Sequence, residues 1–429
     1  MRPMLNRKRK LMKTLIAFAT SIFAISCSSS GINTTLSPTL PGGPCRSGPT
    51  LASGFTLKEF CPPADPGPGG VIFAASGEEL ALKGYEFPPV NPGDVAFVDG
   101  WRVHFTRMLT TVGRVTLSSN PDFLPGDQSK TGPVVADASG PWAVDLARSD
   151  ASNLPGKGGP EEQAVPLVSL VGQSNGKQFD AANGTRYAFG FNTVAASASA
   201  QNVNLDEAAL ADYEAMTKQG CTTFYAGVAT FKGDKTDAAC YPESRKSWPD
   251  VVKFNFCFKS PTTYINCQNP DNDGRPLADE ESQRGIAFQV SRSVIAQITI
   301  HTDHPFWEGM VHDAPAHFDQ FAARVVGQTP GAEPPSVTLE MTKDVPYIGY
   351  TDAAGNPIDW RYCIKPATGE REGHMSFEPG SLPRAIGGDP ATGLRDYYDF
   401  ATYNQSTQGH LNSDGLCAVA RDYPPPYVR

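Results

Sequence analysis

Prolines and glycines interrupt this chain too often for a fold built on long helices. There are 38 prolines and 41 glycines among its 429 residues. Both residue types cost stability inside a helix, whereas short strands joined by turns accommodate them. The composition therefore predicts a mainly β protein. We expect a β-sandwich core, either as one large sandwich or as two smaller ones.

Segments rich in β-branched and aromatic residues recur between turn residues and are the candidate strands of this fold. The expected strands cover residues 71–75, 101–106, 114–118, 165–171, 187–194, 222–231, 251–259, 285–290, 294–301 and 336–341.

At least one helix is expected beside these strands, from Leu205 to Gln219. Asn204 is a suitable N-cap, Glu207 would complete a capping box, and Gly220 would close the C-terminal end. A second, shorter helix is expected over residues 396–407.

The N-terminus has the three-part pattern of a secretory signal peptide. A basic segment ends at Lys13, an apolar run covers residues 15–25, and Cys27 follows Ser26. The apolar run is shorter than the roughly 20 residues that a membrane-spanning helix needs. The pattern therefore favours export of the chain.

The end of this segment, Ala24-Ile-Ser-Cys27, resembles the lipobox of bacterial lipoproteins, with Ala24 where leucine is commoner. The resemblance is confined to the N-terminal segment. It implies that Cys27 receives lipid after cleavage. Ser28 is similar to the residue found at that place in lipoproteins of the outer membrane, on its periplasmic or its outer side.

The signal divides the chain into three expected regions. Residues 1–26 are the signal peptide, and residues 27–70 are the lipidated Cys27 with a tether rich in proline, glycine and serine. Residues 71–429 are the β-rich globular region. If this region holds two domains, the boundary is expected near residues 200–220.

The eight cysteines other than Cys27 form an even set, and export favours their oxidation to four disulfides. We expect neighbours along the chain to pair, as Cys45–Cys61, Cys221–Cys240, Cys257–Cys267 and Cys363–Cys417. No two are spaced as CxxC, which argues against zinc sites built from thiolates.

The charge of the exported chain limits its partners. Removal of the signal leaves 30 basic and 45 acidic residues, a net charge of −15. Nucleic acids are bound through cationic contacts to phosphate, so this class of partner is disfavoured. The charge favours cations instead.

Histidines concentrate in one short segment. Four of the seven lie close together, namely His301, His304, His312 and His317. In the expected strand 294–301, alternate residues face opposite sides, with Ala296, Ile298 and Ile300 on one side and Gln297, Thr299, His301 and Asp303 on the other. Imidazoles and carboxylates at such spacing are typical of transition-metal sites.

We therefore predict a zinc or copper site in which His301 and His304 are ligands. Asp303 is a third ligand or orients an imidazole, and His104 or His410 completes the set. A helix beginning at Pro305 would place His304, Glu308 and His312 on one face. A hydrogen-bonded polar surface is the alternative reading of the same residues.

The segment Thr299-Ile-His-Thr-Asp-His304 also resembles the HxHxDH signature of the metallo-β-lactamase superfamily. Thr299 replaces the first histidine, and the helix–strand alternation of that αββα fold is absent from the surrounding sequence. The resemblance implies a metallohydrolase with Asp303 beside a metal-bound water.

An Asp/Asn/Gly-rich segment has the spacing of a calcium loop. Its oxygen ligands would be Asn269, Asp271, Asp273 and Glu280. A turn between two strands is the alternative.

Three classes of function remain open on the sequence. The first is a binding module of the cell envelope, for a divalent transition metal. The second is an exported metallohydrolase at the same residues. The third is a structural or adhesive surface lipoprotein without a site.

Overall fold

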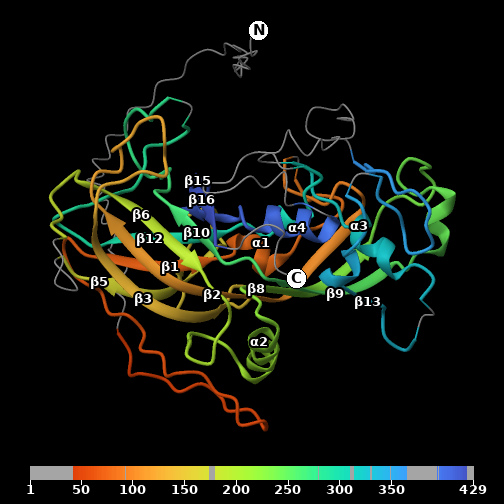
Figure 1. Cartoon of the computed structure of the whole chain (residues 1–429), viewed down its shortest axis with the longest axis horizontal. Helices are drawn as coiled ribbons and strands as arrows, with labels where there is room; N and C mark the ends of the chain where they lie inside the picture. Colours follow the sequence, from red (N-terminus) through yellow and green to blue (C-terminus); the bar gives the residue numbers. More distant parts are fainter. Residues whose placement is uncertain are drawn as a thin grey trace, which may run out of the picture. The chain divides into compact units, whose positions relative to one another are not determined.

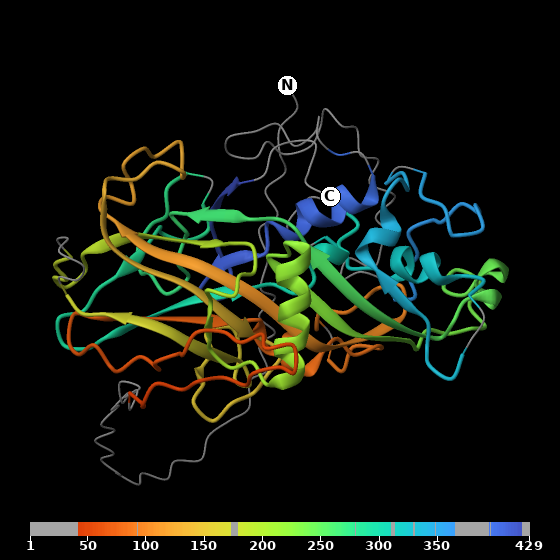
Figure 2. The same ribbon diagram turned by 60° about the horizontal axis from the view of Figure 1, so that its bottom comes forward.

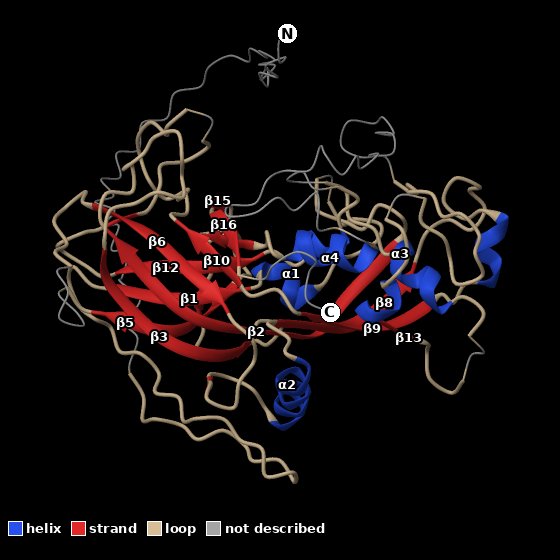
Figure 3. Cartoon of the chain, in the orientation of Figure 1, coloured by secondary structure: helices blue, strands red, loops and turns tan. Residues whose placement is uncertain are grey.

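Strands make up most of the regular structure, arranged in two sheets (Figure 1, Figure 3). The computed structural model describes residues 42–91, 93–172, 179–278, 280–309, 314–328, 331–347, 349–364, 394 and 396–422. The signal peptide, Cys27, Ser28 and His312 lie outside these residues. The protein is mainly β, as the composition predicts.

The smaller sheet holds the strand that carries the histidine segment. Its six strands, in spatial order, are β15 (Gly415–Leu416), β14 (Gly409–Leu411), β12 (Val294–Ile300), β1 (Val71–Ser76), β5 (Gln163–Leu170) and β4 (Leu154–Pro155). The central pair, β1 and β12, runs parallel, with Ser76 opposite Thr299. Both strands are apolar on the side that faces the larger sheet.

The larger sheet is organised by one long strand, β2 (Trp101–Ser118). Its first half pairs with β8 (Thr223–Phe231), and its second half pairs with β3 (Val134–Asp145) and β6 (Arg186–Thr193). The remaining strands are β9 (Val251–Phe258), β10 (Thr262–Ile265), β13 (Ser336–Thr338), β16 (Ala418–Arg421), and the two-residue strands β7 (Gln201–Asn202) and β11 (Ile286–Ala287).

The two sheets bury their facing sides in one hydrophobic core. Phe73 of β1 stacks on Phe189 of β6, with ring centroids 5.8 Å apart. Ala296, Ile298 and Ile300 of β12 point into this core and are fully buried. The predicted alternation of β12 is therefore confirmed, and the arrangement is consistent with a β-sandwich.

Short helices cover the edges and faces of the sheets. The α-helices are α1 (Glu78–Lys83), α2 (Glu207–Gln219), α3 (Asp319–Ala322) and α4 (Tyr397–Gln405). In the part of the chain that the structure describes, four 3-10 turns accompany them: η1 (Glu243–Ser247), η2 (His304–Phe306), η3 (Ala323–Val325) and η4 (Leu339–Thr342). Helix α2 lies across the outer face of the larger sheet (Figure 2) and buries Leu210 and Tyr213 against it.

The predicted helix ends are right at the C-terminus and wrong at the N-terminus of α2. Gly220 adopts the left-handed conformation expected of a C-cap. The N-cap is Asp206, whose carboxylate accepts a hydrogen bond from the Ala209 N–H, so the helix begins at Glu207. Asn204 does not cap the helix because its side-chain amide is hydrogen-bonded to the backbone of Asp145.

The ranges expected at 101–106 and 114–118 are parts of one strand, β2, and two other strand predictions differ clearly in extent. Seven strands among the described residues are new: β3, β4, β7, β10, β14, β15 and β16. The strand expected over 285–290 shrinks to β11, and the strand expected over 336–341 ends at Thr338, where η4 begins. Strand β3 contains Gly140 and Pro141, which are typical of a turn. It continues through them because its pairing with β2 shifts register between Val112 and Arg114.

The eight cysteines other than Cys27 all form disulfides, but only one predicted pair is right, Cys45–Cys61. The other three bridges are Cys221–Cys257, Cys240–Cys363 and Cys267–Cys417. Two of these follow the sheet rather than the chain: β8 pairs with β9, which brings Cys221 to Cys257, and β10 pairs with β16, which brings Cys267 to Cys417.

Removal of the Cys267–Cys417 bridge should cost more stability than removal of Cys45–Cys61. The bridges close loops of 150 and 16 residues, and chain entropy assigns them about 5 and about 3 kcal/mol. Equilibrium unfolding of the two double Cys→Ala variants in denaturant measures the difference. An equal loss, or a larger loss from Cys45–Cys61, would contradict this ranking.

Candidate metal centre

The histidine segment lies where the parallel strands β1 and β12 end. Glu78 follows the end of β1 and His301 directly follows β12. Because the carboxyl ends of parallel strands meet at one edge of a sheet, these two side chains are neighbours. On the other side of β12, the antiparallel β14 places His410 opposite Thr299.

Two groups of side chains at this edge have ligand atoms within 4.8 Å of one another. The first is His301, Asp303 and His304, and the second is Glu78, His301 and Asp414. Nitrogen and oxygen ligands of these types are those of zinc and copper sites in proteins. The His301/Asp303/His304 group has the composition and spacing to hold a metal ion.

His304 is held in one tautomer by the segment that follows α4. Its Nδ1 lies 2.8 Å from Thr407 Oγ1, and this hydroxyl donates its own proton to the carbonyl of Asn404. The hydroxyl therefore accepts from Nδ1–H, which leaves the lone pair of His304 on Nε2. This is the hydrogen-bonding pattern of an imidazole prepared to coordinate a metal.

Trp307 supports two of the three residues in the first group. Its indole stacks on the His304 ring with centroids 3.7 Å apart. Its Nε1–H donates to Asp303 Oδ2 at 3.0 Å. The tryptophan is 4% exposed, so it fixes both side chains from within the protein.

In His301 the proton is on Nε2, whereas in His304 it is on Nδ1. Its Nε2 lies 3.1 Å from the carbonyl oxygen of Ser413, which only accepts, so Nε2–H donates and the lone pair of the neutral ring is on Nδ1. Burial alone would lower the pKa of His301, but Glu78 and Asp303 outweigh it and the pKa is raised.

Glu78 and Asp414 are the two residues of these groups that the sequence analysis missed. Glu78 Oε1 is 3.7 Å from His301 Nδ1. Burial raises the pKa of Glu78 from 4.5 to about 7, against the opposing effect of His301. Its backbone has φ of 61°, a left-handed conformation that is strained for a side chain other than glycine. The available signal for Glu78 was a carboxylate directly after a buried strand.

His410 belongs to the same cluster, and His104 does not. The His410 ring is buried, with its centroid 4.1 Å from that of His301 and 5.6 Å from that of His304. It packs against the first group without being one of the three residues whose ligand atoms converge. His104 is 42% exposed on β2 and contacts Glu86, so it is outside the cluster.

The helix expected beyond Pro305 is only the three-residue turn η2, because Trp307 is extended and pairs with Ala316. Glu308 therefore does not lie on the same helix face as His304, contrary to the prediction. Its carboxylate accepts hydrogen bonds from Tyr362 and from His317, the latter at 2.8 Å. His317 is fully buried there, in a polar cluster apart from the metal-binding group.

The three carboxylates predicted as calcium ligands, those of Asp271, Asp273 and Glu280, are in neither group of close ligand atoms that the described residues contain. Asp271 is paired with Lys157 at 2.7 Å, and Glu280 is paired with Arg284. Asn269 uses its side-chain oxygen to accept from the Asp271 N–H and from Asn412. The segment is a turn stabilised by these bonds.

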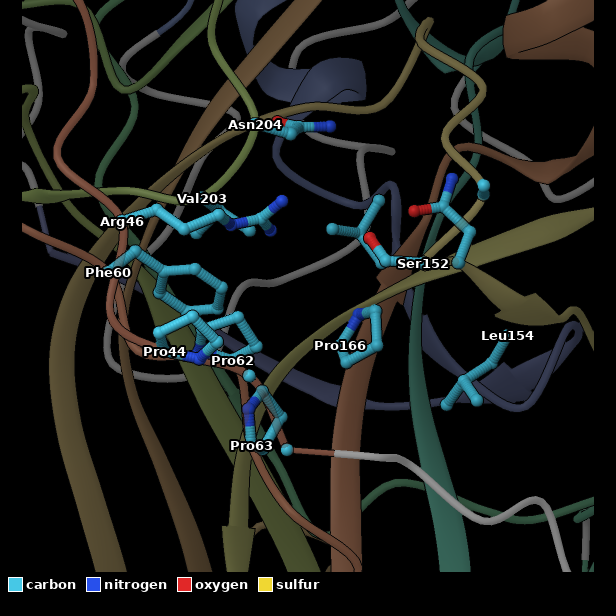
Figure 4. Close-up of a pocket in the computed structure, with 15 residues that line it drawn as sticks. Pro44, Arg46, Phe60, Pro62, Pro63, Ser152, Leu154, Pro166, Val203 and Asn204 are labelled. Carbon is cyan, nitrogen blue, oxygen red and sulfur yellow. The ribbon is translucent and has the colours of Figure 1, made fainter.

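Two cavities are relevant to ligand binding. One, of about 470 Å³, is lined by Glu78 and Glu162 and so adjoins the candidate metal centre. The other, of about 400 Å³, has prolines and Phe60 along one wall and Pro166 opposite, with Arg46 at its side (Figure 4). This second cavity contains no histidine, cysteine or carboxylate among its lining residues.

Comparison with known proteins adds no assignment, since no protein-family model, curated protein or solved structure matches the chain. Among the described residues, no helix has the length and apolar character required to cross a membrane. The chemistry of the candidate metal centre is therefore the basis for a functional assignment.

Neutralising Glu78 should stabilise the metal-free protein at pH 8 and have little effect at pH 5. The folded-state pKa of Glu78, about 7, lies above its ordinary value of 4.5, so stability falls as pH rises between these values. Two to three pKa units correspond to about 3 kcal/mol. Unfolding of Glu78→Gln across this pH range measures the effect.

Glu79→Gln is the matched control, because Glu79 is the next residue and its carboxylate reaches Lys83 at the surface. It should leave the pH dependence unchanged. A Glu78→Gln protein with the same pH profile as the unsubstituted protein would show that the Glu78 carboxyl titrates normally.

Proposed function

We propose that this protein is a lipid-anchored protein of the bacterial cell envelope that binds a divalent transition metal ion, zinc or copper. The ligands are His301, Asp303 and His304. The observation that carries the proposal is the convergence of their ligand atoms within 4.8 Å. A zinc ion with bonds of about 2.1 Å holds tetrahedral ligands about 3.4 Å apart, so small side-chain movements complete the site.

The hydrogen bonds around the site support a metal rather than a solvated polar surface. Thr407 and Ser413 each fix one imidazole proton, and Trp307 holds Asp303. Such outer contacts cost a protein conformational freedom and are recurrent around metal ligands. The clustering of three histidine rings also speaks against a surface protein without a site, in which scattered histidines are expected.

The exported metallohydrolase is the second candidate, and the cavity beside Glu78 favours it. A hydrolytic metal needs an open coordination position and room for a substrate. The cavity of about 470 Å³ would provide that room. The partial likeness of Thr299–His304 to the metallo-β-lactamase signature agrees with this candidate only in part, since Thr299 is not a ligand type for that site.

Metal analysis of the protein purified without an affinity tag tests the binding function. We expect zinc or copper at about one ion per chain, and loss of that ion in the His301→Ala/His304→Ala double variant. His104→Ala is the control, because His104 is partly exposed, pairs with Glu86 and is in neither group of converging ligand atoms. Equal and negligible zinc and copper in the unsubstituted protein and the double variant, by elemental analysis and by calorimetric titration, would refute the proposal.

Labelling of bacterial cultures with a radioactive fatty acid tests the anchor. The protein should incorporate label, Cys27→Ser should not, and Ser28→Ala should retain it, because the thioether forms on the cysteine alone. Absence of label from the unsubstituted protein would contradict the lipoprotein assignment and leave the metal site untouched.

A further inference from the structure

Glu78 stands between His301 and the larger of the two cavities. Its carboxylate faces the His301 ring and its side chain also lines the cavity of about 470 Å³. An ion bound to His301 on the side that faces Glu78 therefore lies next to the cavity.

The proton on His301 determines which nitrogen meets this carboxylate. Since Nε2–H donates to the Ser413 carbonyl, the lone pair on Nδ1 is directed to the side of Glu78. The 3.7 Å between Nδ1 and Glu78 Oε1 is close to the separation of two ligands on one ion. The pair is thus spaced for shared coordination.

The backbone at Glu78 gives a second, independent indication. A turn with φ of 61° is most stable with glycine. Glycine occurs one position earlier, at Gly77, yet the strained position carries a glutamate. Strain of this kind concentrates at ligand-binding sites, where it is offset by the surrounding structure.

The wall of the cavity determines which ligands it admits. Carboxylates predominate among its charged side chains, which are Glu78, Glu79, Lys83, Glu86, Asp94 and Glu162. Glu162 is 2% exposed and its carboxylate is fixed by Gln297 and by the Gly158 N–H. An anion entering this cavity meets net repulsion, whereas a neutral or cationic molecule does not.

We propose, on the basis of the metal-binding function above, that Glu78 is a further ligand of the ion bound by His301. With Glu78 as the fourth ligand, a fifth position of this ion, reached by expansion of the tetrahedron, opens into the cavity. There it accepts the lone pair of a small neutral nitrogen ligand, such as imidazole or a deprotonated amine, in preference to an anion.

Substitution with cobalt(II) tests the ligand role, because the intensity and position of its visible absorption report the number and type of ligands. Glu78→Gln should change the spectrum and weaken cobalt binding by about tenfold or more, as even outer-shell partners contribute this much. Glu243→Gln, at an exposed glutamate that pairs with Lys246 and does not line the cavity, should change neither. Cobalt binding with an unaltered spectrum and affinity in Glu78→Gln would overturn the proposal.

Glu78→Gly separates a ligand from a structural residue. It relieves the strained φ, so its unfolding midpoint should equal or exceed that of the unsubstituted metal-free protein, while its cobalt affinity falls as in Glu78→Gln. A lower midpoint with unchanged affinity would assign Glu78 a structural role and overturn the proposal.

Titration of the cobalt protein with imidazole and with azide tests the open position. Imidazole should shift the visible spectrum at lower concentration than azide. A spectrum that neither ligand changes, or a stronger response to azide, would overturn this part. Failure of the unsubstituted protein to bind cobalt, zinc or copper would instead refute the metal-binding function itself.

Discussion

The parallel pairing of β1 with β12 is the constraint on which the rest of the structure depends. It joins two segments far apart in the chain at the centre of the smaller sheet, with their apolar sides in the shared core. Their carboxyl ends consequently meet, and Glu78 and His301 meet with them. A shift of one residue in this register would move Ile298 out of the core and His301 away from Glu78.

The candidate metal centre is built by contacts from outside this strand pair. Thr407 comes from the segment after α4, Ser413 from the turn between β14 and β15, and Trp307 from the residue after η2. Thr407 and Ser413 each fix the position of an imidazole proton. Trp307 fixes the plane of the His304 ring and the carboxylate of Asp303. The preparation of the imidazoles therefore depends on folding of the C-terminal part of the chain.

The strands that were predicted, and the histidine segment, were predictable because they rest on local patterns. The alternation of apolar and polar residues indicated β12. His301, Asp303 and His304 are so close in sequence that they stay near one another in a strand, a turn or a helix. Glu78 was not predictable because only the parallel pairing brings it to His301. His104 lies on the polar face of β2, as expected. The local pattern does not show how far this face is from the edge where β1 and β12 end.

The disulfides show the same division between local and long-range information. Cys45 and Cys61 pair across a short connection, where proximity along the chain is informative. Cys267 and Cys417 are joined because β10 lies beside β16 in the larger sheet. The sequence contains both cysteines and both strands, but not the order of the strands.

The Cys267–Cys417 bridge also has a consequence for the candidate metal centre. Cys417 directly follows the β14–β15 hairpin, which carries His410, Ser413 and Asp414 at the metal-binding edge. The bridge thereby fastens this hairpin to the larger sheet. Reduction of this bridge would therefore loosen the hairpin and, with it, the Ser413 carbonyl that fixes the proton of His301.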